Sequence, residues 1–423
     1  MAPNALSPVD IENMNDAAIE QVRLQVSDVI DPRYDTKWNM LRWLQSNDFN
    51  IPKTVHLLKK HLKWRKDRKL DEPESQSLLQ FSDARRKHAP IDIIGPQRKE
   101  DGDRLVVVDR AGRIDVSGLM KSVQPTEYLH EMFRSFEEIQ RRLMKMEAET
   151  GVQCYMHYIF DLEALNFDPT LLGVVNGPFR VSWQLVGQHY REFIDKFIVI
   201  NSPSYINVLW SALSPFIPEQ SKQRIVFAGS NWKEELLDIV DKECLPERYG
   251  GMIPDIQCLK PVDPIPKSLY WKLPAQYPTM DQLHKVSVSA SKHRMLIYKV
   301  DKPDTELLMY SHNENDITIT LYYSKNKNVS ENDLELAVAP IPKCGLPAMD
   351  LFDYNCEYPG YYYIKLANEA SWLLPSTYRI IVIEKESGKE LEPLNLNEKW
   401  IKKGQKSKKK NISCSLLFQD ELR

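Results

Sequence analysis

The chain has 423 residues, which is too long for one typical core, so we expect two or three domains that each bury enough apolar surface to fold. Its net charge of −3 at pH 7 argues against a nucleic-acid-binding protein. No apolar run is long enough for a membrane span, and the N-terminus has neither a basic start nor an apolar core, so we expect a soluble, non-secreted protein.

Residues 10–75 are predicted to be helical because apolar side chains recur there at helical spacing. The two apolar stripes are Trp38, Leu41 and Leu44, then Val55, Leu58 and Leu62. The second stripe is surrounded by basic residues, namely Lys53, Lys59, Lys60, Lys63, Arg65, Lys66, Arg68 and Lys69. These charges indicate a solvated helix face or, alternatively, a basic face that meets an anionic membrane.

From about residue 76, apolar strands alternate with helices, and this pattern predicts a mainly parallel α/β sheet. The predicted strands are residues 104–108, 155–161, 197–200 and 225–228. A long helix is predicted over residues 127–147, where apolar side chains share one face. No Gly-rich phosphate loop follows any of these strands, which excludes a nucleotide-binding Rossmann domain.

The helix predicted at residues 205–217 is apolar over most of its surface, and Pro215 and Pro218 end it. Such a helix is either a buried crossover of the α/β core or a cover over something hydrophobic. Periodicity alone favours the buried crossover.

Six prolines between residues 252 and 278 break regular structure and predict an interdomain linker. After the linker, apolar and polar residues alternate in short strands, which is typical of an antiparallel β-sandwich. The predicted strands are at residues 286–288, 296–298, 317–323, 334–338, 361–366 and 378–383. From Lys399 the chain is a lysine-dense tail that is not expected to be ordered.

The sequence lacks the motifs of the common enzyme classes, including a G-x-S-x-G elbow, an H-E-x-x-H helix and a Walker loop. Its six cysteines form no C-x-x-C pair, so neither a zinc site nor a disulfide framework is indicated. We therefore expect no catalysis, no cofactor and no metal, with reduced thiols in the cytosol.

Five motifs, taken in order, resemble the CRAL-TRIO lipid-binding family. They are LRWL at residues 41–44, DIIG at 92–95, KFIVINSP at 196–203, GSNWKEELL at 229–237 and LPERYGG at 245–251. Downstream, CEYPGYYYIKL at residues 356–366 is similar to the GOLD β-domain of the animal branch that includes supernatant protein factor and tocopherol-associated protein. Cys356, Gly360 and Tyr362 match the GOLD turn motif, and Trp372 replaces a residue of another turn.

The resemblance implies an α+β multidomain fold of five parts. These are an N-terminal helical cap at residues 1–75, a CRAL-TRIO α/β lipid-binding domain with a mainly parallel sheet at 76–255, a proline-rich linker at 256–280, an antiparallel GOLD β-sandwich at 281–390 and a basic tail at 391–423.

Phosphoinositide-binding members of the family, such as the yeast phosphatidylinositol/phosphatidylcholine transfer protein, hold the inositol phosphate with a glutamate and a lysine, and a hydroxyl residue lies three before the lysine. The matching residues here are Glu192, Arg224 in place of the lysine, and Ser221. Arginine keeps the charge and can bind phosphate through two hydrogen bonds. The alternative is a structural ion pair between neighbouring strand ends.

Two departures from the family pattern bear on the ligand. Gln45, Ser46 and Asn47 replace a stretch that contains a headgroup-contacting arginine, and Met156 and Tyr158 replace hydroxyl residues that contact choline phosphate. Phosphatidylcholine is therefore less favoured than phosphatidylinositol, and a neutral isoprenoid-like ligand stays open.

In the family, the helix after the turn that matches Asn201-Ser202-Pro203 swings to open the cavity and dips into the bilayer. The resemblance thus implies that the apolar helix is a gate over a lipid pocket. The pocket and gate residues that we predict are Tyr158, Phe160, Tyr205, Leu209, Trp210, Leu213 and Phe216.

Together these observations predict a cytoplasmic protein, peripheral on intracellular membranes, that transfers or senses one phosphatidylinositol-like or isoprenoid-like lipid. The alternative is a GOLD-dependent trafficking or signalling adaptor whose bound lipid is regulatory. The expected partners are the lipid, a transient membrane surface and a protein bound through the GOLD domain, but no nucleic acid.

Overall fold

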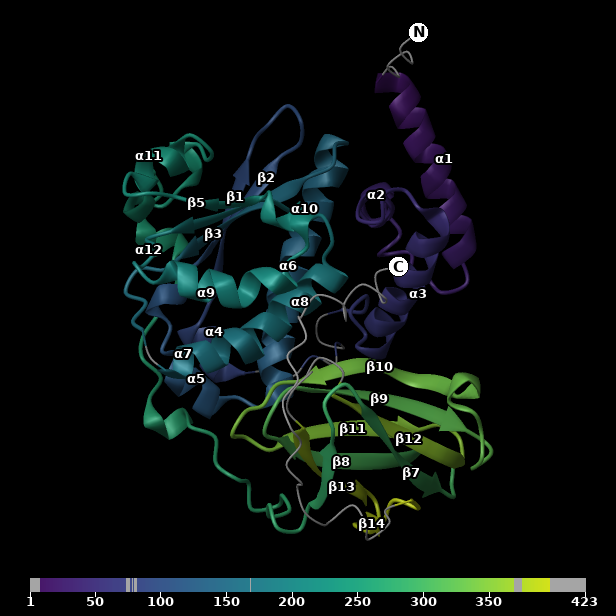
Figure 1. Cartoon of the computed structure of the whole chain (residues 1–423). Coiled ribbons are helices and arrows are strands. Elements are labelled where there is room, and N and C mark those ends of the chain that lie inside the picture. Colours follow the sequence, from purple (N-terminus) through teal and green to yellow (C-terminus); the bar gives the residue numbers. More distant parts are fainter. Residues whose placement is uncertain are drawn as a thin grey trace, which may run out of the picture. The chain divides into compact units, whose positions relative to one another are not determined.

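The computed structural model describes residues 8–73, 77, 79, 82–167, 169–368 and 375–395 (Figure 1). The chain forms two compact units. The α/β unit consists of Met1–Asp115, His130–Leu172 and Ser182–Pro264, and the β unit consists of Val116–Leu129, Gly173–Val181 and Ile265–Arg423. Trp372 and the lysine-dense tail lie outside the described residues. Among the helices that the structure describes, none is long and apolar enough to cross a membrane.

Among the described residues, the helices α1 Pro8–Val26, α2 Lys37–Gln45 and α3 Ile51–Asp67 precede the sheet, as the apolar periodicity predicts. A further helix, α4 Asp83–His88, was not predicted. The side chains of Thr36 and Asn50 cap α2 and α3 by accepting hydrogen bonds from backbone N–H groups. The two predicted stripes then pack together in one apolar cluster.

Two members of the predicted basic face are not on the surface. Arg65 is 2% exposed and Arg68 is 6% exposed. Arg65 pairs with Glu137 and Asp71, while the Arg68 guanidinium stacks on the Trp64 ring. The interpretation of these two arginines as surface cations is therefore wrong, because their partners lie inside the fold.

The α/β unit contains a five-stranded sheet of order β1-β2-β3-β4-β5. Its strands are β1 Ile91–Gln97, β2 Arg104–Asp109, β3 Tyr155–Asp161, β4 Ile194–Ile200 and β5 Ile225–Phe227. β2 to β5 run parallel, as predicted, and β1 is an additional antiparallel edge strand. The prediction missed β1 because it contains Gly95 and Pro96 and an irregular register between Ile93 and Gly95.

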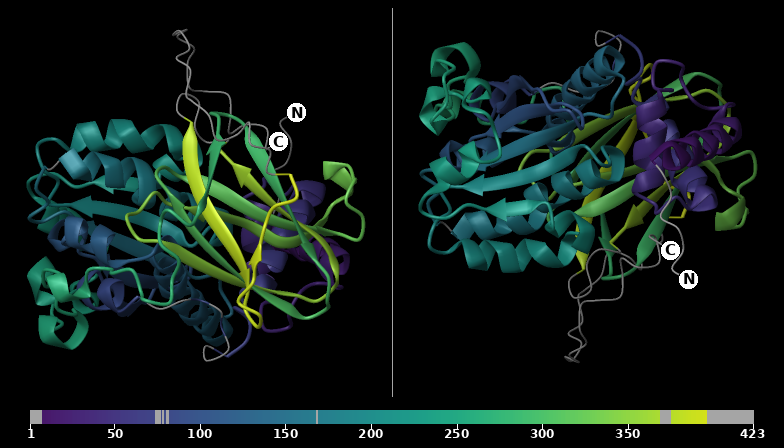
Figure 2. Two further views of the ribbon diagram at one scale, coloured as in Figure 1. Left: turned by 90° about the horizontal axis from the view of Figure 1, so that it is seen from below. Right: turned by 90° about the horizontal axis from the view of Figure 1, so that it is seen from above.

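The inner strands are covered on both faces, and Figure 2 shows helices on both sides of the sheet. On one face, Val106, Ile159 and Ile198 pack in a cluster with Leu236 and Tyr249. On the other face, an aromatic cluster covers the strands. Continuous apolar strands are expected for such a parallel sheet.

The helices that follow the first strands are α5 Val116–Ser122, α6 Pro125–Thr150, α7 Pro169–Val174, a π-helix at Val175–Phe179 and α8 Arg180–His189. After β4 come α9 Ile206–Leu213, a 3-10 turn at Ser214–Phe216, α10 Glu219–Lys222, α11 Trp232–Leu237 and α12 Asp255–Cys258. Further 3-10 turns are Ala111–Arg113, Lys242–Cys244, Glu247–Tyr249, Lys267–Leu269 and Glu331–Asp333.

The β unit contains two antiparallel sheets, which confirms the predicted antiparallel class. Its strands are β6 His284–Val288, β7 His293–Val300, β8 Thr305–Asn313, β9 Ile317–Ser324, β10 Glu335–Lys343, β11 Asp350–Cys356, β12 Gly360–Ala367, β13 Ser376–Glu384 and β14 Glu390–Leu391. One sheet has the order β10-β9-β12-β7, and the other has the order β11-β8-β13-β14 with β6 also paired to β13. β8, β11 and β14 were not predicted.

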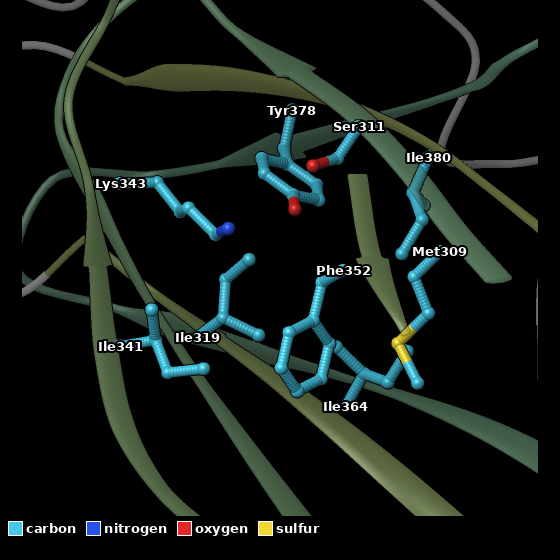
Figure 3. Close-up of a pocket in the computed structure, with 9 residues that line it drawn as sticks. All are labelled: Met309, Ser311, Ile319, Ile341, Lys343, Phe352, Ile364, Tyr378 and Ile380. Atoms are coloured by element: carbon cyan, nitrogen blue, oxygen red, sulfur yellow. The ribbon is translucent and has the colours of Figure 1, made fainter. Parts of the chain in front are cut away.

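Side chains from both sheets form one core in this unit. A small cavity remains in it, with about the free space of one water molecule. Figure 3 shows the Lys343 amine and the Tyr378 hydroxyl pointing toward the apolar side chains that line this space. Lys343 is satisfied by Asp350 and by the Thr126 hydroxyl, so its role is structural.

Two short segments from far earlier in the sequence belong to the β unit. The first contains α5 and the start of α6, where Gln124 Nε2 donates to the Met349 carbonyl at 2.6 Å. The second contains the π-helix, next to which Arg180 pairs with Asp316 at 2.8 Å. The predicted independent β-domain therefore includes residues that sequence order places elsewhere.

Candidate functional site

Glu192 and Arg224 form an ion pair at the start of two neighbouring parallel strands. Glu192 follows α8 with a left-handed backbone (φ 57°), and Arg224 lies between α10 and β5. Arg224 Nη2 donates to the Glu192 carboxylate, while Nη1 donates to the Ile194 carbonyl at 2.8 Å. The side chains are 38% exposed for Arg224 and 21% exposed for Glu192. The structure thus brings together the two charges that the sequence suggested.

Ser221 lies on the same turn but is not part of this side-chain network. Its carbonyl accepts a hydrogen bond from the Arg224 backbone N–H at 3.1 Å, and its side chain is exposed. Among the contacts of the described residues, backbone rather than hydroxyl atoms connect Ser221 to Arg224. Its predicted headgroup role stays a prediction.

Tyr158 and Phe160 lie on β3 in an aromatic cluster. The Phe197 ring stacks on Tyr158 at 5.2 Å and contacts Phe160 at 5.4 Å, and the Trp183 ring meets both Tyr158 and Phe197 edge-on. The Tyr158 hydroxyl donates to Asp109 Oδ2 at 2.8 Å. Burial raises the pKa of Asp109 to about 6. This part of the α/β unit therefore contains a cluster of aromatic rings and the Asp109 carboxyl, which is protonated more easily than an exposed one.

The predicted gate helix is α9 with its 3-10 extension, and it is not a buried crossover. Within α9 itself, Leu209 is the buried side chain, and Val208 is 52% exposed. Leu213 and Phe216 are half-buried. The Trp210 ring meets Phe227 edge-on at 5.2 Å, and the Tyr205 ring meets Phe167 in the same way. The structure therefore rejects the core-crossover alternative for this helix.

The family comparison decides the nature of this unit. Residues 93–251 match the CRAL/TRIO domain family, and this range includes most of β1, all of β2 to β5, the ion pair and α9. Residues 93–251 form a CRAL/TRIO domain. Residues 269–392 match a second family, described as "F28H7_8_C:-like, C-terminal domain". That description does not mention GOLD, so the GOLD assignment stays a prediction.

Relatives of the CRAL/TRIO-containing chain include the phosphatidylinositol/phosphatidylcholine transfer protein SFH9 of Arabidopsis thaliana, which is 25% identical over 266 residues. The match covers 58% of this chain and 43% of SFH9, so the chain spans less than half the length of that relative. Among solved structures, the crystal structure of Sfh5 matches this chain with a TM-score of 0.45 at 15% identity. The match covers 61% of this chain and 93% of the Sfh5 chain.

The sequence did not reveal Arg191, which lies between the CRAL/TRIO domain's α8 and Glu192. Its guanidinium stacks on the Trp43 ring at 4.7 Å and donates to Ser46 Oγ at 3.3 Å. Burial lowers the pKa of Arg191. Arg191 therefore brings a cation to the segment in which Gln45, Ser46 and Asn47 replace the family's arginine-rich stretch, and only the fold could show this.

The turn at the base of the CRAL/TRIO domain's α9 is fixed by Asp161. Its Oδ1 accepts from Asn201 Nδ2 at 2.8 Å, and its Oδ2 accepts from the Tyr249 hydroxyl at 3.0 Å. Burial, followed by the charge of Asp161, raises the pKa of Tyr249. The motifs KFIVINSP and LPERYGG thus meet at one buried carboxylate, although neither motif by itself indicates the contact.

Across the described residues, no group of three His, Cys, Asp or Glu side chains could hold a metal ion. The five described cysteines are free thiols.

Proposed function

We propose that this chain binds one hydrophobic lipid and exchanges it with membranes, acting without catalysis. The match to the CRAL/TRIO family and the name of the Arabidopsis relative support a lipid ligand. The observation that carries the proposal is the partly exposed Glu192–Arg224 pair. A phosphatidylinositol-like headgroup fits this pair better than a neutral headgroup, because it offers both phosphate and hydroxyl groups.

Arg224 and Glu192 would bind different groups of the lipid headgroup. The Arg224 guanidinium carries five N–H donors in a planar fork, which matches two phosphate oxygens. The Glu192 carboxylate accepts hydrogen bonds from inositol hydroxyls and also orients the arginine through their mutual bond. Arg191 would add a second positive charge near the phosphate, which compensates for the arginine missing from Gln45, Ser46 and Asn47.

The acyl chains determine how much free energy of transfer from the bilayer the protein must match. Each methylene taken from the bilayer contributes roughly 0.8 kcal/mol, so a diacyl lipid needs an apolar environment of nearly equal quality inside the protein. The aromatic cluster around Tyr158 and Phe160 and the inner side of α9, including Leu209, would supply it. Because the apolar terms nearly cancel, headgroup contacts would decide which lipid is retained.

Exposed apolar residues on α9 and at the end of β5 support a transient membrane contact. Val208 and Phe227 are 52% and 41% exposed, and Trp210 and Tyr205 are side chains that favour a membrane interface. We infer a cytoplasmic protein that is peripheral on membranes, whose β unit would meet a protein partner.

The experiment is exchange of pyrene-labelled phosphatidylinositol from donor to acceptor phosphatidylcholine vesicles. Glu192→Gln and Arg224→Ala should remove the preference for phosphatidylinositol over phosphatidylcholine while the thermal midpoint stays near that of the wild type. Arg142→Ala is the matched control, because Arg142 also belongs to a partly exposed ion pair, with Glu138 on α6. Unchanged selectivity in both site variants would reject the headgroup assignment.

An isoprenoid-like ligand gives a different result. Native mass spectrometry of the purified protein would then show a neutral lipid without phosphate, and Glu192→Gln would leave its occupancy unchanged. A co-purified phosphatidylinositol that is lost in Arg224→Ala would support the phospholipid instead.

A further inference from the structure

The loop that begins at the end of β3, residues 161–167, contacts the gate segment at two points. Asn201, directly after β4, donates from Nδ2 to Asp161 Oδ1 at 2.8 Å. Tyr205, directly before α9, donates from its hydroxyl to the Leu165 carbonyl at 2.6 Å. Both ends of the short connection between β4 and α9 are therefore fixed to the same loop, which we call the β3 loop.

The backbone at this junction is held in a conformation that it does not prefer. Asn201 has φ 54°, and Ala164 in the β3 loop has φ 68°. Asparagine tolerates the left-handed region, whereas alanine adopts it rarely, so surrounding contacts must hold this geometry. The ring of Phe167 adds to these contacts by meeting the Tyr205 ring at 5.2 Å.

The β3 loop is itself anchored to the body of the domain. The buried Tyr249 of the LPERYGG motif donates to Asp161 Oδ2 at 3.0 Å, and Arg113 and Arg248 donate to Glu163 Oε2 at 2.6 and 3.2 Å. Asp161 is 1% exposed, so its carboxylate depends on protein donors such as the Tyr249 hydroxyl rather than on water. The loop is thus the fixed partner, and the segment from Asn201 to α9 is the one that can leave.

We propose that the β3 loop is a catch that keeps the gate closed, with the Asp161 carboxylate and the Leu165 carbonyl as its two acceptors and Asn201 and Tyr205 as the matching donors. Tyr249 is a positioning residue that holds Asp161 in place. The link from the catch to lipid exchange rests on the proposed function, whereas the catch itself rests on the contacts above.

The catch predicts a measurable change in how often the gate opens. A hydrogen bond to a charged acceptor shifts an equilibrium about tenfold or more, and a neutral bond to a carbonyl somewhat less. Removing either donor should therefore raise the open fraction of the gate by about that factor without altering the rest of the fold.

The direct test is hydrogen–deuterium exchange of the backbone amides in α9. Asn201→Gly keeps the left-handed backbone but removes the side-chain carboxamide that donates to Asp161. Tyr205→Phe keeps the ring contact but removes the hydroxyl that donates to the Leu165 carbonyl. Asn201→Gly should accelerate exchange in α9 about tenfold, and Tyr205→Phe somewhat less. Tyr363→Phe is the matched control, because its hydroxyl also donates to backbone carbonyls, those of Asn326 and Lys327, but in the β unit.

The outcomes separate the catch from the proposed function. Unchanged α9 exchange in both gate variants, or equal acceleration in Tyr363→Phe, would overturn the catch. If α9 exchange accelerates in the gate variants alone, the catch stands. In that case, transfer of pyrene-labelled phosphatidylinositol between phosphatidylcholine vesicles should also quicken. Failure of the wild-type protein to transfer this lipid would reject the proposed function and leave the catch intact.

Discussion

Asp350, the first residue of β11, accepts two hydrogen bonds from Thr126, one from its backbone N–H at 3.3 Å and one from its hydroxyl at 2.6 Å. Thr126 is the second residue of α6, so a β-strand residue caps a helix at a position 224 residues earlier in the sequence. The buried Lys343 amine bonds to both residues and balances the carboxylate charge. Within the β unit, β11 is therefore joined to the start of α6 by a buried network.

We predict that Lys343→Met destabilises the β unit by about 3–5 kcal/mol, because it leaves the Asp350 carboxylate buried without its cation. Adding Asp350→Asn to this variant should restore most of the loss, since the amide still accepts from Thr126 and carries no charge. Urea unfolding followed by fluorescence measures both effects. Lys385→Met is the control, because its pair with Glu306 is about half exposed and should contribute below about 1 kcal/mol. Equal losses in Lys343→Met and Lys385→Met would contradict the prediction.

The parts of the fold that sequence patterns predicted are those determined by neighbouring residues. Apolar runs predicted β2 to β5, and helical periodicity predicted α2, α3 and α6. β11 was missed because its sequence, DLFDYNC, mixes charged and apolar side chains without a clear period. The placement of residues 116–129 in the β unit was also missed, because contacts such as Thr126 to Asp350 join residues that no local pattern connects.

In the candidate site too, local motifs predicted some residues, whereas residues that act through long-range contacts were missed. The family resemblance was sufficient to single out Glu192 and Arg224, which the structure pairs, whereas the gate role of α9 stays a prediction. Arg65 was misplaced because its partner Glu137 lies 72 positions away. Arg191 and Asp161 could not be singled out, because their roles depend on Trp43, Ser46, Asn201 and Tyr249, which only the folded chain brings near them.

The buried carboxyl of Asp109 should make stability depend on pH. Burial raises its pKa from 3.8 to about 6, so the neutral form is favoured in the folded protein. The stability that this group contributes is complete below the unfolded pKa and is lost as the pH rises toward 6, a loss of about 3 kcal/mol. Asp109→Asn should therefore be more stable than the wild type above pH 6 and lose that advantage near pH 4. Urea unfolding between pH 4 and 8 measures this difference, and a constant gap across that range would count against it.

The contact between His61 and His189 predicts the opposite dependence. Their Nδ1 atoms lie 3.0 Å apart, and Arg65, Arg68 and Arg191 are the charges that face the two rings. Burial, followed by these charges, holds the pKa of both imidazoles well below 6.5. Each neutral ring then contributes stability that is complete above pH 6.5 and is lost at about 1.4 kcal/mol per pH unit as the pH falls.

This slope is best measured in the Asp109→Asn background, where the opposing carboxyl no longer titrates. The urea midpoint should fall between pH 7 and 5, and it should fall much less when His61→Gln and His189→Gln are added. Equal slopes with and without the two histidines would show that the pair is not the titrating group.

Charge placed on the gate should stop exchange of every ligand, whatever its headgroup. Leu213 is the last residue of α9 and is half-buried, so Leu213→Asp would put a carboxylate at a partly buried position of the helix. That carboxylate must be desolvated each time the gate closes or enters a bilayer, which costs several kcal/mol. We expect vesicle-to-vesicle transfer of pyrene-labelled phosphatidylinositol and of pyrene-labelled phosphatidylcholine to fall together, by tenfold or more. Leu24→Asp, which makes the same substitution at an exposed position of α1, should retain most of the transfer. Normal transfer by Leu213→Asp would show that α9 does not cover the lipid.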